Sequence, residues 1–438
     1  MRRFTALLLA LVLALGLMAC ASDDAATTTP DTAGDTTADT ASDAADTGDT
    51  GSTGDSADNA SDAAADGETF LLGTYLQLTG SNAVAGTDAQ RAIDLAVKYI
   101  NENGGFNGVP VEVLHYDTTG STEEAVKVVQ RMLSSDNVDA VVGSVNSNEV
   151  SACISYLNEA KVYNFGLGTS ATWMEDPEMV YTFRASANNG RVAPVDVDVI
   201  MSLGYDTVAI INGTDDTGAS TADAFEAACA EKGLTVTTRQ QCDTDDTDFS
   251  GQIAQILATD PDCIFMSTIG QTTGPFVKQV RNMGYRGIIC FKDCFSQEYQ
   301  AIAGAENSNY VIFAYPYVVY ESIEDCNIEP VREFLELYYN EYGEMIQHEA
   351  AYRGWDTMMV MWEASKIAGS NDSEALREAT NQVVVEGLGG TLDYTAGDRE
   401  GYSTFNSFIL VDGKNLPLTE WQENGGYEEY LAATGRDR

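Results

Sequence analysis

The sequence predicts an α/β fold of two lobes, each built around a mostly parallel sheet. From Phe70 onward, short apolar runs alternate with amphipathic segments, which is the pattern of strands connected by right-handed helical crossovers. This alternation breaks near Arg184–Asn189 and then starts again. Two such runs in series favour two α/β lobes, and a single α/β barrel is the alternative.

The first run opens with an apolar strand over Phe70–Leu78 and a helix that begins at Thr87 or Asp88 and ends near Asn103. Two glycines, Gly104 and Gly105, favour a helix end at that point. The expected elements that follow are a strand over Val109–Tyr116, a helix over Thr122–Leu133, a strand over Val138–Val142, a helix over Val150–Glu159 and a strand over Val162–Phe165.

The second run repeats the pattern. Its expected strands cover Thr207–Ile211, Leu234–Thr238, Cys263–Met266 and Gly287–Cys290, and its expected helices cover Ala219–Lys232, Phe249–Leu257 and Gly274–Met283. After a strand over Tyr310–Pro316, the helices over Val331–Tyr342 and Ala350–Ala368 suggest that the chain returns to the first lobe. Closing segments at Thr391–Tyr394 and Phe405–Val411 are expected to complete the second lobe.

The first 20 residues have the features of an export signal. Arg2 and Arg3 supply the positive start, and an apolar run from Phe4 to Met18 follows. The run ends in Leu17-Met18-Ala19-Cys20, which resembles a bacterial lipobox. Cys20 is therefore expected to be lipidated and to anchor the mature chain to the membrane. The alternative is an ordinary secretory peptide with an incidental cysteine.

Residues 21–67 contain almost only Asp, Thr, Ala, Ser and Gly, with no aromatic residue and no Lys or Arg. Such a segment cannot bury enough apolar surface to offset its ordering entropy, and its aspartates repel one another. We expect a disordered tether between the anchor and a folded domain over residues 68–438.

The charge balance excludes whole classes of function. The 438 residues hold 23 Lys and Arg against 68 Asp and Glu, a net charge of −45, which would repel nucleic acid. Only His115 and His348 are histidines, so a histidine-rich metal site is excluded. The sequence lacks the Gly-x-Ser-x-Gly and phosphate-loop motifs. We therefore expect no catalytic residues, no metal and no cofactor.

Several short stretches of the sequence, taken in their order along the chain, indicate a resemblance to a known family. They are Thr79-Gly80 followed by Gly86 and Ala92-Ile93, Asn101–Gly105 followed by Gly108, Val113–Asp117, Val138–Gly143, and Gly397-Asp398 before Phe405. From about Thr69 to Asp412 the chain resembles the type I periplasmic binding proteins, and within them the branched-chain amino-acid (Leu/Ile/Val) binding proteins of ABC importers.

This resemblance implies two Rossmann-like lobes joined by three crossover strands, with a solute bound between them. It places lobe one at about 68–187 plus 317–378, and lobe two at about 188–316 plus 379–438. The implied function is that of an extracytoplasmic solute-binding lipoprotein, with an amino acid or analogue as ligand and an ABC permease in the membrane as partner. A sensory protein of the same fold, which presents its solute to a receptor, is the alternative.

Two loops of lobe one are candidates for ligand binding. Ligands of open α/β sheets bind beyond the carboxyl ends of the strands, where helix N-termini offer free N–H groups. Asn146 and Ser147 lie in one such loop, and Gly168, Thr169 and Ser170 lie in the next. By the resemblance, Ser147, Gly168 and Thr169 hold the carboxylate and ammonium of an amino acid. A second possible role of Ser147 is to cap its own helix.

Lobe two contributes Thr217, Gly270 and Asp293, and Tyr352 in a late helix is a further candidate. The resemblance implies that Asp293 pairs with the ligand ammonium, whereas the alternative is a surface turn pair with Lys292. Thr217 stands where the family usually has tyrosine, and Ala85 stands at a family aromatic position. These departures favour a ligand more polar or larger than a branched-chain amino acid.

Overall fold

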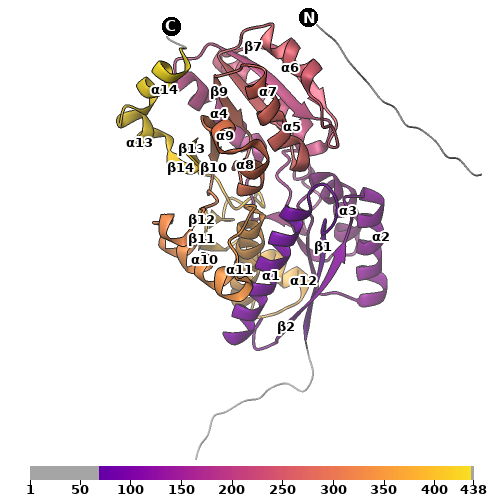
Figure 1. The fold of residues 1–438 in the computed structure, drawn as a ribbon. Helices are drawn as coiled ribbons and strands as arrows, with labels where there is room; N and C mark the ends of the chain where they lie inside the picture. The colour runs from indigo at the N-terminus through magenta and orange to yellow at the C-terminus, as the bar shows by residue number, and fades with distance from the viewer. Residues whose placement is uncertain (1–68, 436–438) are drawn as a thin grey trace, which may run out of the picture. The chain divides into compact units, whose positions relative to one another are not determined.

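A computed structural model describes residues 69–435 and confirms the α/β fold with two lobes (Figure 1). Each lobe has its own sheet, so the barrel alternative is wrong. The predicted lipidation of Cys20 and the predicted tether over 21–67 lie outside the described residues. Within 69–435, no helix is long and apolar enough to cross a membrane.

The sheet of the first lobe has five parallel strands in the order β2-β1-β3-β4-β5. The strands are β1 (Phe70–Leu76), β2 (Val111–Asp117), β3 (Ala140–Gly143), β4 (Tyr163–Gly166) and β5 (Thr182–Arg184). The helices between them are α1 (Ala83–Glu102), α2 (Thr122–Arg131), the π-turn Met132–Asp136 and α3 (Ser147–Glu159). β3, β4 and β5 are buried throughout, as expected for a parallel sheet with helices on both faces.

The sheet of the second lobe has the order β14-β13-β10-β9-β8-β6-β7. Five of its strands are parallel, namely β6 (Thr207–Gly213), β7 (Thr235–Cys242), β8 (Cys263–Ser267), β9 (Ile288–Phe291) and β10 (Val311–Tyr315). β13 (Asn406–Val411) and β14 (Lys414–Pro417) extend the sheet in antiparallel fashion.

The helices of the second lobe precede, separate and follow these strands. They are α4 (Asn189–Ser202), α5 (Asp216–Lys232), α6 (Ser250–Leu257), the 3₁₀ turn Gly270–Thr272, α7 (Thr273–Asn282), α8 (Gln297–Ala303), α9 (Ala305–Ser308), α13 (Leu418–Glu423) and α14 (Gly426–Thr434).

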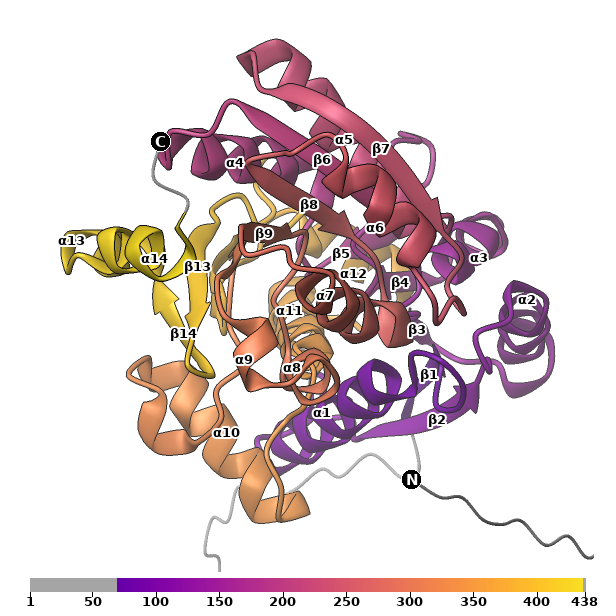
Figure 2. The ribbon, with the colours of Figure 1, turned by 45° about the horizontal axis from the view of Figure 1, so that its top comes forward.

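The chain passes between the lobes three times, after β5, after β10 and before β13. After β10 it returns to the first lobe, where α11 (Ala350–Ala368) packs along α1. Figures 1 and 2 both show α10 (Glu329–Tyr342) and α11 next to α1, although more than 200 residues separate them in the chain. α12 (Ser373–Thr380) packs against α11 and β4. The predicted return of these helices to the first lobe is confirmed.

Thr391–Tyr394, which was expected to complete the second lobe, joins the sheet of neither lobe. β12 (Gly390–Asp393) pairs only with β11 (Val384–Gly387), as a separate two-stranded antiparallel sheet that contacts α11. The turn of this hairpin is fixed to α11, because the Leu388 N–H donates to Asp356 Oδ1 at 2.9 Å.

Candidate functional site

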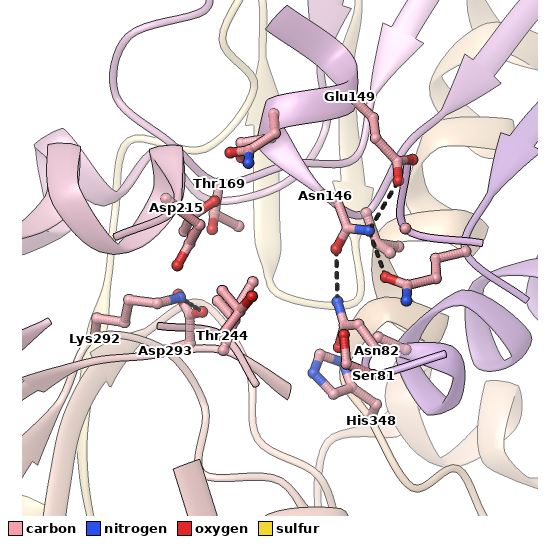
Figure 3. Close-up of a pocket in the computed structure, with 18 of the residues that line it drawn as sticks. Ser81, Asn82, Asn146, Glu149, Thr169, Asp215, Thr244, Lys292, Asp293 and His348 are labelled. Atoms are coloured by element: carbon pink, nitrogen blue, oxygen red, sulfur yellow. Dashed lines mark hydrogen bonds and ion pairs between the residues drawn. The ribbon is translucent and has the colours of Figure 1, made fainter. Parts of the chain in front are cut away.

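A pocket of about 710 Å³, including the part that opens to solvent, lies between the two lobes. Its lining from the first lobe comprises Gln77, Ser81, Asn82, Ala85, Gly120, Val145, Asn146, Ser147, Asn148, Glu149, Thr169, His348 and Arg353. The second lobe supplies Asp215, Thr217, Thr244, Ile269, Lys292, Asp293 and Tyr299. Figure 3 shows side chains of both lobes facing one another across this space.

The topology explains why polar residues gather here. Most lining residues follow the carboxyl ends of β1, β3 and β4 in the first sheet and of β6, β8 and β9 in the second. Within each sheet these strands run parallel to one another. The N-termini of α3 and α5 also border the pocket, through Ser147 and Thr217. The first turn of an α-helix leaves N–H groups without intrahelical acceptors, so these two ends favour anionic or acceptor groups of a ligand.

Asn146 organises the side of the pocket that belongs to the first lobe. Its Nδ2 donates to Gln77 Oε1 at 2.7 Å and to Glu149 Oε1 at 3.3 Å, and its Oδ1 accepts from Asn82 Nδ2 at 2.9 Å (Figure 3). Burial raises the pKa of Glu149, against hydrogen bonds from neighbouring side chains that lower it. The network fixes the orientation of these amides before any ligand arrives.

Ser147 joins the two pocket loops of the first lobe. It is the first residue of α3, and its Oγ accepts a hydrogen bond from the Ser170 N–H at 3.1 Å. Gly168 permits this close packing, because a Cβ there would lie 2.5 Å from Ser147 Oγ. Since the N-cap of α3 is Asn146, and no side chain caps the helix, the capping role considered for Ser147 is wrong.

Asp293 and Lys292 form a buried ion pair at the end of β9. The other carboxylate oxygen of Asp293, Oδ1, accepts from Asn189 Nδ2 at 3.0 Å. Burial alone would raise the pKa of Asp293, but the Lys292 ammonium, the Arg353 guanidinium and these hydrogen bonds together lower it. Asp293 is therefore a charged carboxylate inside the pocket, and the alternative of a surface turn pair is wrong.

Asp215 is the N-cap of α5. Its Oδ1 accepts from the Gly218 N–H at 2.9 Å, whereas its Oδ2 has no hydrogen-bond partner within the described part of the chain. Burial raises its pKa, and both the Gly218 N–H and the nearby Lys292 ammonium oppose that shift.

His348 lies just before α11 and Arg353 lies within it, and both residues line the pocket. Arg353 donates to the Leu167 carbonyl at 3.0 Å and pairs with Glu349. Burial and the Arg353 charge lower the pKa of His348 to about 3, so its ring is neutral. The ring lies 3.1 Å from the Tyr299 hydroxyl of α8, which is a direct contact between the lobes.

The structure brings five of the predicted binding residues to the pocket lining, namely Asn146, Ser147, Thr169, Thr217 and Asp293. Their role in binding remains a prediction. The other four do not line it. Gly168 and Ser170 lie behind Ser147, and Gly270 packs so closely on the other lobe that a Cβ would lie 2.8 Å from the Ser81 carbonyl. Tyr352 is fully buried among the rings of Tyr317 and Phe334.

Sequence reasoning missed Lys292, His348 and Arg353 as pocket residues. Arg353 is one residue from the predicted Tyr352, and a helix turns by about 100° per residue, so neighbouring side chains point in different directions. Lys292 was visible next to Asp293, but its burial in the pocket cannot be read from adjacent charges.

Comparison with known sequences gives a consistent set of relatives. The sequence model of the periplasmic binding protein family matches residues 71–414. The Leu/Ile/Val-binding protein homolog 7 of Brucella abortus (strain 2308) is 23% identical over 325 residues, which cover 72% of this chain and 81% of that protein. An amino acid binding protein of Pseudomonas aeruginosa is 26% identical over 207 residues, or 47% of this chain and 55% of that protein.

Solved structures share the fold. The branched-chain amino acid transporter substrate binding protein LivJ of Streptococcus pneumoniae, in complex with isoleucine, has a TM-score of 0.70 and 22% identity, and the match covers 80% of this chain and 98% of that one. A solute binding protein of an ABC transporter from R. palustris, in complex with benzoate, has a TM-score of 0.72 and 18% identity, with 80% and 96% covered.

Proposed function

The chain belongs to the periplasmic binding protein family, and from this premise we propose that it is the extracytoplasmic solute-binding component of an ABC importer. The observation that carries the proposal is the interlobe pocket, to which both lobes contribute charged and hydrogen-bonding side chains. A solute that contacts both lobes stabilises their closed arrangement by the difference between its contacts in the open and closed states.

The proposed ligand is an amino acid or an amino-acid-like small polar solute. Asn146, Ser147, Thr169, Thr217 and Asp293 are proposed to contact it, since all five line the pocket. Ala85 and Thr217 line the pocket, and by the resemblance they stand at positions that are aromatic in the family, while Asn82 and Gln77 add amides. This polar lining supports a solute more polar than leucine, isoleucine or valine.

A thermal-shift screen of amino acids, amides, hydroxy acids and small peptides tests the ligand class. A ligand at 100 times its dissociation constant should raise the free energy of unfolding by about 2.7 kcal/mol. If a folded chain responds to none of these solutes, the proposed ligand class is wrong.

An uptake assay separates import from sensing. Cells that lack the protein should lose uptake of the radiolabelled ligand, and a plasmid copy should restore it. Unchanged uptake in the deletion strain would refute the importer role and favour the sensory alternative.

We also propose that Cys20 carries a lipid anchor and that residues 21–67 form the tether to the folded domain. The motif before Cys20 and the composition of the segment after it support this. Cys20→Ser should abolish fatty-acid labelling and release the protein from the membrane fraction or block its maturation. Fatty-acid labelling that persists in the Cys20→Ser variant would show that Cys20 is not the lipidated residue.

A further inference from the structure

We propose that Lys292 fills the position in lobe two where an amino-acid ammonium would bind, so that the site prefers carboxylates without an α-ammonium group. This inference rests on the proposed solute-binding function and narrows its ligand class. It concerns one charge in the pocket and leaves the importer role unchanged.

Asp293 is already paired with a cation in the structure. Lys292 pairs with one of its carboxylate oxygens, and Asn189 donates to the other at 3.0 Å. A ligand ammonium that took the place of Lys292 would leave a buried lysine without its counter-charge, which is strongly unfavourable. An ammonium that joined Lys292 would place a second positive charge beside Asp293, whose two carboxylate oxygens are both bonded already.

Lys292 is held in this position by its surroundings. Its side chain is almost fully buried, and its backbone N–H donates to the Met266 carbonyl at 3.2 Å. The Lys292 ammonium also acts on Asp215, since burial raises the pKa of that carboxyl and the Lys292 charge opposes the rise. Figure 3 shows the Lys292 side chain on the wall of lobe two, with its nitrogen next to Asp293 and with Asp215 nearby.

The pocket still offers hydrogen-bond donors for a carboxylate. Arg353 is 3% exposed and already pairs with Glu349 through Nη2, so the donor it offers is its Nε, which has no partner within the described residues. The N-terminus of α3 borders the pocket through Ser147 and Asn148, and Thr169 adds a hydroxyl. A helix N-terminus, an arginine and a hydroxyl together suit an anionic oxygen pair.

The test compares matched solutes on the chain without its first 20 residues, by titration calorimetry. The pairs are alanine and lactate, leucine and 2-hydroxy-4-methylpentanoate, and glutamate and 2-oxoglutarate. In at least one pair, the member without the ammonium should bind about 10-fold or more tightly, the factor expected for one charge-assisted hydrogen bond. Tighter binding of the amino acid in every pair that binds would overturn the inference but leave the proposed function intact.

Variants at Lys292 test the cause. Lys292→Met removes the ammonium and keeps an unbranched chain, so Asp293 becomes available and the preference should shift towards the amino acid. Lys292→Gln provides the same test if the methionine variant does not fold. Lys278→Met is the matched control, because Lys278 lies exposed on α7 of the same lobe, and it should keep the wild-type preference.

The remaining outcomes are also decisive. An unchanged preference in a folded Lys292→Met or Lys292→Gln variant would overturn the inference. A folded wild-type chain that binds none of the six solutes would overturn the inference, whereas the proposed ligand class fails only if the thermal-shift screen also finds no ligand.

Discussion

Ser147 is the residue through which the two pocket loops of the first lobe are joined, because its Oγ accepts the Ser170 N–H at 3.1 Å. Ser147→Ala leaves this buried N–H without an acceptor. We expect the free energy of unfolding to fall by about 1–3 kcal/mol and ligand affinity to fall by up to about tenfold. Urea denaturation and calorimetry with the best ligand measure both effects.

Ser202→Ala is the control for this prediction. Ser202 is exposed at the end of α4, where its hydroxyl donates to the Val199 carbonyl, and it lies outside the pocket lining. The variant should bind the ligand with wild-type affinity. Wild-type stability and affinity in Ser147→Ala would show that the Ser170 N–H finds another partner.

The seven cysteines of the described chain are free and buried. Burial, with nearby acidic groups, raises the thiol pKa of Cys153 and Cys242 to about 12, so the reactive thiolate is scarce at neutral pH. A chain that begins at Ala21 should therefore react slowly with Ellman's reagent when folded, and all seven thiols should react in guanidinium. Fewer than seven thiols after denaturation would reveal a disulfide.

The sequence predicts a pocket residue correctly where its position after a strand is enough to place it in the lining. Ser147 and Asp293 follow strands of parallel sheets, and their place in the lining follows from that topology. Lys292 and Arg353 were missed because their roles depend on burial and on helix rotation, which are properties of the packed structure. Tyr352 shows the same limit, since its ring faces the core rather than the pocket.

At the scale of elements, the first turn of α1 must approach the loop after β1. Gly86 allows this, because a Cβ there would lie 1.9 Å from the carbonyl oxygen of Gln77. Gly86→Ala should force a backbone shift, lower the free energy of unfolding by about 1–3 kcal/mol and weaken ligand binding, since Gln77 lines the pocket. Denaturant unfolding and calorimetry measure the two effects.

Gly251→Ala is the matched control, because Gly251 lies exposed in α6 with no atom within 4 Å of the added Cβ. Alanine should stabilise this helix by up to about 1 kcal/mol and leave ligand binding unchanged. If Gly86→Ala behaved like this control, the close approach of α1 to Gln77 would be refuted.

Helices and strands with a clear hydrophobic period could be predicted from the sequence. Those whose bounds depend on contacts with other helices and strands could not. The strands around Val138–Val142 and Cys263–Met266 match β3 and β8 closely, because continuous apolar runs indicate buried strands. α1 begins at Ala83, before the predicted Thr87, and the preceding Asn82 bonds to Asn146 instead of capping the helix with its side chain. α4 was missed because Pro194 interrupts its pattern.

At the scale of the whole molecule, Asp356 connects α11 to the segment that leads into the second lobe. Its Oδ1 accepts from the Leu388 N–H of the β11–β12 turn at 2.9 Å, and its Oδ2 accepts from the Tyr402 hydroxyl. Tyr402 lies just before β13, on the last passage of the chain between the lobes. Burial raises the pKa of Asp356 to about 7, although both hydrogen bonds act in the opposite direction.

The raised pKa of Asp356 makes the stability of the fold depend on pH. The folded state holds the proton of Asp356 up to about pH 7, whereas the unfolded chain releases it near pH 3.8. The stabilisation by Asp356 is therefore fully present below pH 3.8 and is lost as the pH rises through 7. Between pH 3.8 and pH 7, Asp356 lowers the free energy of unfolding by at most about 1.4 kcal/mol for each unit by which the pH rises.

Asp356→Asn isolates this contribution, because the amide keeps the shape and can accept from Leu388 but has no proton to lose. Urea unfolding of both proteins from pH 4 to pH 8 should show the variant gaining stability relative to wild type as the pH rises, with the difference levelling off above pH 7. Glu349, whose pKa burial also raises to about 7, titrates in both proteins and cancels in the comparison. A stability difference that stays constant across the range would mean that Asp356 is ionised in the folded state at every pH tested.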